Sequence, residues 1–174
     1  MSIKIHTSEI ELIRDLKCGD MVLLSGEIYT ARDAAHKRLC DSVIKGEALP
    51  FSPKDKIIYY AGPTPTKPGG IIGSCGPTTS GRMDKYAPLL LDMGLLAMIG
   101  KGERSDSVID SMIKNKAVYF GAIGGAGALI SKSVTEVETI CYDDLGTEAI
   151  RKLTVTDFSV TVVIDSKGNS ILIE

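Results

Sequence analysis

The sequence predicts an α/β fold in which packed helices cover a mixed sheet. Short apolar runs typical of buried strands recur along the 174 residues, and segments with helical periodicity lie between them. Residues 158–164 alternate between apolar and polar side chains, and a turn at 166–169 leads toward an expected return strand at 171–173. Because no internal repeat or linker divides the chain, we expect a single domain over residues 1–174.

The composition is that of an ordinary globular protein, with 44% hydrophobic and 24% charged residues. A net charge of -2 gives no reason to expect nucleic acid or an anionic membrane surface as a partner. The first sixteen residues lack the apolar core of a signal peptide, and no apolar run is long enough to span a bilayer. We therefore expect a cytoplasmic protein that does not contact membranes.

The expected elements follow from periodicity and from residues that begin or end helices. Ser8 and Thr30 are the expected N-caps of the first two helices, with Asp33 as the capping partner of Thr30. Pro88 predicts a kink or a restart within the third helix. We expect helices at 8–16, 31–44, 86–96 and 105–114. We expect strands at 21–24, 56–61, 95–99, 117–120 and 137–142.

The stretch most suited to chemistry is a glycine-rich polar loop that runs from Gly73 to Arg82. Its glycines allow a positive φ or a close approach of the backbone to a ligand. Its hydroxyl residues, Thr78 among them, are candidate caps for the helix that follows, and free N–H groups at a helix N-terminus favour an anion. A turn with a simple helix cap is the commoner role of such residues.

Three cations can reach the same region. Arg82 ends the loop and carries a planar fork that matches a carboxylate, and Lys101 follows the next expected strand. Arg32 lies in the first turn of the second expected helix, where a cation opposes the helix dipole. An anionic ligand would explain that position, and an ion pair with a nearby carboxylate is the simpler alternative. These cations predict a site for a small anion.

A second glycine cluster and the four cysteines are two other candidates for a functional site. The glycines from Gly121 to Gly127 follow an expected strand, but their spacing is not G-x-G-x-x-G and no fitting acidic residue follows, so close packing is the simpler explanation. The four cysteines form no C-x-x-C pair, and neither His6 nor His36 lies at metal-ligand spacing from them. We expect no metal site within this chain. Cys75 is the cysteine with a candidate function, because it lies in the glycine-rich loop.

The motifs together resemble a known family. SGEIYTARDAAHKR at 25–38, GPTTSGRMDKYAPLLLDMGL at 76–95 and IGKG at 99–102 are similar to the β subunit, or C-terminal region, of class I fumarate hydratase. The resemblance continues through AVYFGAIGGAGAL and the terminal VIDSKGN, so it covers nearly the whole chain. The β subunit of L-tartrate dehydratase shares the GPTTS core, but it lacks Gly81 and departs from the first motif.

The resemblance implies a swivelling β/β/α domain and the reversible hydration of fumarate to L-malate, a step of the tricarboxylic acid cycle. Arg32, Arg82 and Lys101 would hold the substrate carboxylates, and Thr78 would move the C3 proton. A 4Fe-4S cluster would be carried by a separate α subunit, so that the active species is a hetero-oligomer. The residues agree with this on charge, because a dicarboxylate requires two or three cations.

Three functions thus remain open at this stage. The first is half of an iron–sulfur hydro-lyase, acting on fumarate or, as the alternative, on tartrate. The second is a non-catalytic module that binds a dicarboxylate through the same cations. The third, a nucleotide-binding domain, is disfavoured by the missing acidic residue.

Overall fold

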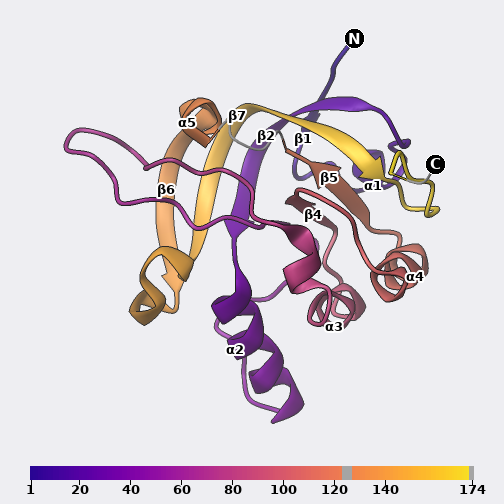
Figure 1. Cartoon of the computed structure of the whole chain (residues 1–174), viewed down its shortest axis with the longest axis horizontal. Coiled ribbons are helices and arrows are strands. Elements are labelled where there is room, and N and C mark those ends of the chain that lie inside the picture. Colours follow the sequence, from indigo (N-terminus) through magenta and orange to yellow (C-terminus); the bar gives the residue numbers. More distant parts are fainter. Residues whose placement is uncertain (123–126, 173–174) are drawn as a thin grey trace.

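The structure, a computed structural model, describes residues 1–122 and 127–172, and within them seven strands form one mixed sheet (Figure 1). The strands are β1 (Ile3–His6), β2 (Met21–Thr30), β3 (Ile57–Tyr59), β4 (Ala97–Gly100), β5 (Val118–Gly121), β6 (Val134–Cys141) and β7 (Ile150–Ile164). The helices are α1 (Ile10–Arg14), α2 (Asp33–Ile44), α3 (Ala87–Asp92), α4 (Asp106–Asn115) and α5 (Gly127–Ile130), with short 3₁₀ helices η1 (Ser80–Met83), η2 (Ser131–Ser133) and η3 (Asp143–Glu148). The predicted α/β class is confirmed.

The sheet closes on itself through its last strand. Strands β1 to β5 run parallel in the order of the chain, and β7 is antiparallel to β2, β5 and β6. Because β7 pairs with both β2 and β5, the strands β2, β3, β4, β5 and β7 form a barrel-like ring. The predicted alternation along β7 is confirmed, since Val160, Val162 and Ile164 are all buried.

Two apolar clusters stabilise this arrangement. One is shared by the strands of the ring and includes Ile57 and Tyr59, and the other lies between the sheet and helices α2, α3 and α4 and includes Ile58 and Tyr60. Successive side chains of a strand point to opposite faces, so a strand that is buried on both faces must be apolar at every position. This explains why residues 57–60 are uninterrupted Ile and Tyr.

The helix boundaries differ from the expected ones at both predicted N-caps. Thr30 is the last residue of β2, and its Oγ1 accepts a hydrogen bond from the Arg151 amide, so α2 begins only at Asp33 with Arg32 as its N-cap. Ser8 does not cap α1, because its hydroxyl contacts Nδ1 of His6 at 2.7 Å. Each hydroxyl therefore contacts a residue outside the helix that it was expected to cap.

Two further predictions concern helix and strand continuity. The restart at Pro88 is confirmed, because η1 and α3 are separate and Pro88 lies in the first turn of α3. The return strand at 171–173 is wrong for its described part: Ile164 and Ser170 form one isolated bridge, and Ile171 and Leu172 are not in a strand. The glycines from Gly121 to Gly127, for which close packing is expected, lie partly outside the described residues. In the described part of the chain, no helix has the length and apolar character needed to cross a membrane.

Candidate active site

The site lies where three parallel strands end. Parallel neighbours present their carboxyl ends at one edge of a sheet, so residues that follow β2, β3 and β4 are brought together. Backbone hydrogen bonds join the ends of these strands. The Ala31 amide donates to the Tyr59 carbonyl (3.1 Å), and the Tyr60 amide donates to the Ile99 carbonyl (2.8 Å). Arg32 follows the first of these strands and Lys101 the last.

The glycine-rich loop joins this edge through its backbone. The Thr78 amide donates to the Tyr60 carbonyl at 2.7 Å, and the Ser80 amide donates to the Lys101 carbonyl at 2.9 Å. Thr79 and Lys101 pair as a parallel bridge. The loop therefore runs along the ends of β3 and β4, which places Thr78, Arg82 and Lys101 in one region.

The expected helix cap in this loop is wrong. Thr79 is the N-cap of η1, but its side chain makes no capping hydrogen bond. The Ser80 hydroxyl is buried and faces Tyr119 instead, at 2.8 Å from the phenolic oxygen. Within the described residues, the hydroxyls of Thr78 and Thr79 have no protein hydrogen-bond partner, so both are available to a ligand.

The glycines of the loop permit contact with other chain segments. A Cβ on Gly73 would overlap the Thr64 carbonyl oxygen, and one on Gly76 would lie 3.6 Å from the backbone of Gly127. Thr64 and Ser74 close the base of the preceding loop, through Thr64 N to Ser74 O at 2.9 Å and Ser74 N to Thr64 Oγ1 at 2.8 Å. The stretch between them extends away from the sheet (Figure 1).

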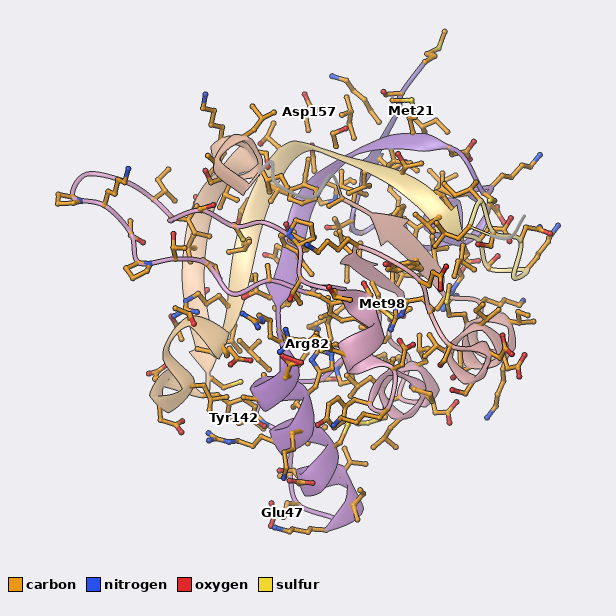
Figure 2. All side chains as sticks on the ribbon, in the orientation of Figure 1. Met21, Glu47, Arg82, Met98, Tyr142 and Asp157 are labelled. Carbon is orange, nitrogen blue, oxygen red and sulfur yellow. The ribbon has the colours of Figure 1, made fainter. Side chains whose placement is uncertain are left out.

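The two arginines meet at one carboxylate. Oδ2 of Asp33 lies 2.8 Å from Nη2 of Arg82 and 3.7 Å from Nη2 of Arg32. Figure 2 shows Arg82 beside the first turn of α2, where Asp33 lies. The sequence had suggested Asp33 only as a capping partner of Thr30; its actual partners are the two cations. Arg32 thus has a carboxylate nearby, as the ion-pair explanation of its position predicts. It also lies near Arg82, as an anion-binding site would require.

The Arg32 side chain packs against the backbone at Gly62. A Cβ on Gly62 would lie 3.0 Å from Cδ of Arg32, so the glycine allows the Arg32 side chain to pack closely against the backbone there. Nε of Arg32 is buried without a hydrogen-bond partner in the described part of the chain. Such an unsatisfied donor is costly unless a ligand or water receives it.

His36 supports the same residue from behind. Its ring is fully buried, and Nδ1 lies 2.8 Å from the carbonyl oxygen of Arg32. Burial lowers the pKa of His36 to about 4, so the ring is neutral at physiological pH. The neutral ring therefore carries its proton on Nδ1 and donates it to the Arg32 carbonyl.

A buried arginine that the sequence did not single out stabilises the loop. Arg104 donates from Nε to Asp84 (2.8 Å) and from Nη2 to the Tyr60 hydroxyl (3.1 Å). Burial lowers the pKa of Arg104, but Tyr60 and Asp84 more than offset this and the net shift is upward. Arg104 is therefore a permanent cation under the site. Its position in a loop after Gly102 carries no periodic signal.

The cysteines do not form a metal site. Cys75 is fully buried, and burial raises the pKa of its thiol to about 12, which leaves it unreactive. Within residues 1–122 and 127–172, no three His, Cys, Asp or Glu side chains are grouped as metal ligands would be. The donor set of this part of the chain does not fit an iron–sulfur cluster. The suggested functional role of Cys75 thus finds no support in its surroundings.

The closed mixed sheet, with cations and a hydroxyl at the ends of its parallel strands, defines an α/β domain with a candidate anion site. Residues 1–174 match the family model described as the fumarase C-terminus, and the chain belongs to that family.

Three relatives show the range of this similarity. The chain is 44% identical over 148 residues to the aerobic class I fumarate hydratase of Salmonella typhimurium, covering 84% of this chain and 26% of that protein. It is 42% identical over 153 residues to fumarate hydratase 2 of Leishmania major, covering 87% and 27%. It is 38% identical over 165 residues to a Methanocaldococcus jannaschii protein assigned as L(+)-tartrate dehydratase subunit beta, covering 91% and 85%. The chain thus spans about a quarter of the length of these fumarate hydratases.

Proposed function

We propose that this chain is the β subunit of an iron–sulfur hydro-lyase that reversibly hydrates fumarate to L-malate. The observation that carries the proposal is that Arg32 and Arg82 share the Asp33 carboxylate, while the backbones of Thr78 and Lys101 lie at the same edge of the sheet. A dicarboxylate needs two or three cations at its ends, and the fork of an arginine suits a carboxylate. The family and the named fumarate hydratases among its relatives support this substrate class.

Each residue has a proposed task. Arg32 and Arg82, which share Asp33, would bind one carboxylate, and Lys101 would supply a point charge for the other. The Thr78 hydroxyl would transfer the C3 proton. A threonine hydroxyl is a weak base on its own, so Thr78 requires a neighbouring group that accepts its proton. We expect that group to come from the partner.

We propose that the cofactor is a 4Fe-4S cluster, held by cysteines of a separate α subunit. When bound, such a cluster supplies a Lewis acid for the substrate hydroxyl and a carboxylate. The residues of this chain would form the opposite wall of the cleft, where they bind and orient the substrate. Side-chain exposures of 26% for Arg32 and 53% for Arg82 are compatible with a face that a partner covers.

L-Tartrate dehydration is the second candidate reaction. It is favoured by the Methanocaldococcus jannaschii relative, of which the chain covers 85%. A hydroxyl more or less on the substrate changes few contacts of the cations, so the site residues of this chain serve both reactions. The presence of Gly81 and of the TARDAAHKR motif favours fumarate.

The substrate is decided by an assay of the complex. The chain is co-expressed with its α subunit under anaerobic conditions, and hydration or dehydration is measured with fumarate, mesaconate, L-malate and L-tartrate. We expect the highest kcat/KM for fumarate and L-malate. A higher value for L-tartrate would select the alternative reaction, and binding of fumarate without turnover by the cluster-loaded complex would select the non-catalytic module.

A further inference from the structure

Two guanidinium groups share one carboxylate oxygen at the candidate site. Oδ2 of Asp33 lies within 2.8 Å of Arg82 and 3.7 Å of Arg32. Two like charges this close repel each other, and the repulsion is largest before an anionic substrate arrives. A fixed negative charge between them offsets that repulsion and keeps both cations at the same place.

In the described residues, the Asp33 carboxylate does not cap the amides of its own helix. The α2 amide of Ala34 donates its hydrogen bond to Oε1 of Glu148, at 3.2 Å, on the distant segment η3. A carboxylate in a first helical turn is favourable in any case, and Asp106 has the same place in α4. What distinguishes Asp33 from Asp106 is the contact with two arginines.

Arg82 needs such an anchor because its side chain is half exposed. At 53% exposure, the long side chain would otherwise sample many rotamers, and ordering it would reduce the affinity for substrate. Asp33 contacts Arg82 at Nη2, and the guanidinium has further N–H groups that can bind a substrate carboxylate. The contact also connects the chain segments 25–38 and 76–95.

We propose that Asp33 is a positioning residue, which holds the guanidiniums of Arg82 and Arg32 in the arrangement that receives a substrate carboxylate. The inference rests on the proposed function for its substrate, and on the two ion contacts for its geometry. Asp33 touches the cations and not the reacting carbons, so it acts mainly on binding. Its removal is expected to raise KM more than it lowers kcat.

The first test is kinetic and uses the complex of the full chain with its α subunit. Asp33→Asn removes the charge at constant size, and we expect KM for fumarate to rise on the order of tenfold while kcat changes less than about threefold. Asp33→Glu restores the charge and should recover part of the loss. Asp106→Asn, the matched control, removes a first-turn carboxylate elsewhere and should leave both constants unchanged.

The second test needs no substrate. In the full chain alone, NMR of the arginine Nε–H groups reports the rotation of each guanidinium. We expect the slow rotation of Arg82 to be lost in Asp33→Asn and kept in Asp106→Asn.

The proposal is overturned by unchanged Arg82 rotation in Asp33→Asn. It is also overturned if the Asp33→Asn complex is active with an unchanged KM for fumarate. A lower KM would overturn it too, because Asp33 would then compete with the substrate for the arginines. A wild-type complex that does not hydrate fumarate refutes the proposed function, and the rotation measurement then decides the role of Asp33 by itself.

Discussion

The phenolic oxygen of Tyr119 lies 2.8 Å from Oγ of Ser80 and 2.9 Å from the carbonyl oxygen of Gly102. Ser80 begins η1 and Gly102 follows Lys101, so one side chain of β5 connects two segments of the candidate site. Gly100 is required beside it, because a Cβ there would overlap the Ser80 hydroxyl. The position of the loop thus depends on buried polar contacts beneath it.

Tyr119→Phe removes the hydroxyl and leaves the buried Ser80 hydroxyl and the Gly102 carbonyl with one partner fewer. We expect the free energy of unfolding to fall by about 1–3 kcal/mol, measured by urea denaturation. Tyr142→Phe is the matched control, since the Tyr142 hydroxyl is buried without a hydrogen-bond partner in the described residues and its loss should cost almost nothing. Equal destabilisation by the two variants would contradict the role given to Tyr119.

Arg82→Lys tests whether the site needs a planar fork. A lysine keeps the charge but loses the bidentate geometry. We therefore expect kcat/KM of the complex to fall roughly fivefold to 150-fold, which corresponds to a loss of about 1–3 kcal/mol of transition-state stabilisation. Arg38→Lys is the control, because Arg38 forms its own two-bond ion pair with Asp144 on an exposed surface. Unchanged kinetics in Arg82→Lys would remove Arg82 from the site.

The two adjacent threonines should differ. If the Thr78 hydroxyl transfers the proton, Thr78→Ala lowers kcat far more than it changes KM. Thr79 is exposed and makes no capping hydrogen bond, so Thr79→Ala should alter neither stability nor kinetics appreciably. The reverse ranking in steady-state assays would assign the proton transfer to the other hydroxyl.

Buried His36 makes stability depend on pH. Its folded pKa of about 4 is below the ordinary value of 6.5, so between these values only the unfolded chain takes up the proton. Stability is therefore complete above pH 6.5 and decreases as the pH falls toward 4, by up to about 3 kcal/mol. His36→Asn should flatten this decline in denaturation measured from pH 7 to 4. His6→Asn, at the other and exposed histidine, should not; a decline that His36→Asn leaves intact would assign it to other groups.

The fold class was predictable because the strands carry a local signal. The uninterrupted apolar run at 57–61 indicates a strand that is buried on both faces, and the alternation at 158–164 indicates a strand that is buried on one face. The closure of the ring was not predictable, since it depends on β7 pairing with both β2 and β5. Long-range pairing leaves no mark on a single strand.

The candidate site was predictable in its cations and not in their partners. Arg32, Arg82 and Lys101 follow strand ends or a glycine-rich loop, which are positions that sequence can recognise. Asp33 was misread as a capping residue, and Arg104 was missed, because the meaning of both depends on residues that are distant along the chain. Tyr60 and Tyr119 look like ordinary core residues in sequence, although their hydroxyls support the loop.

Under the proposed function, this chain supplies one wall of a shared active site and no cluster of its own. The most direct measurement compares fumarate hydration by the chain alone, after anaerobic reconstitution with iron and sulfide, with hydration by the chain and its α subunit treated in the same way. We predict turnover and cluster absorbance for the pair, and neither for the isolated chain. Turnover by the isolated chain with bound iron would contradict the assignment of the substrate to a cleft between two subunits.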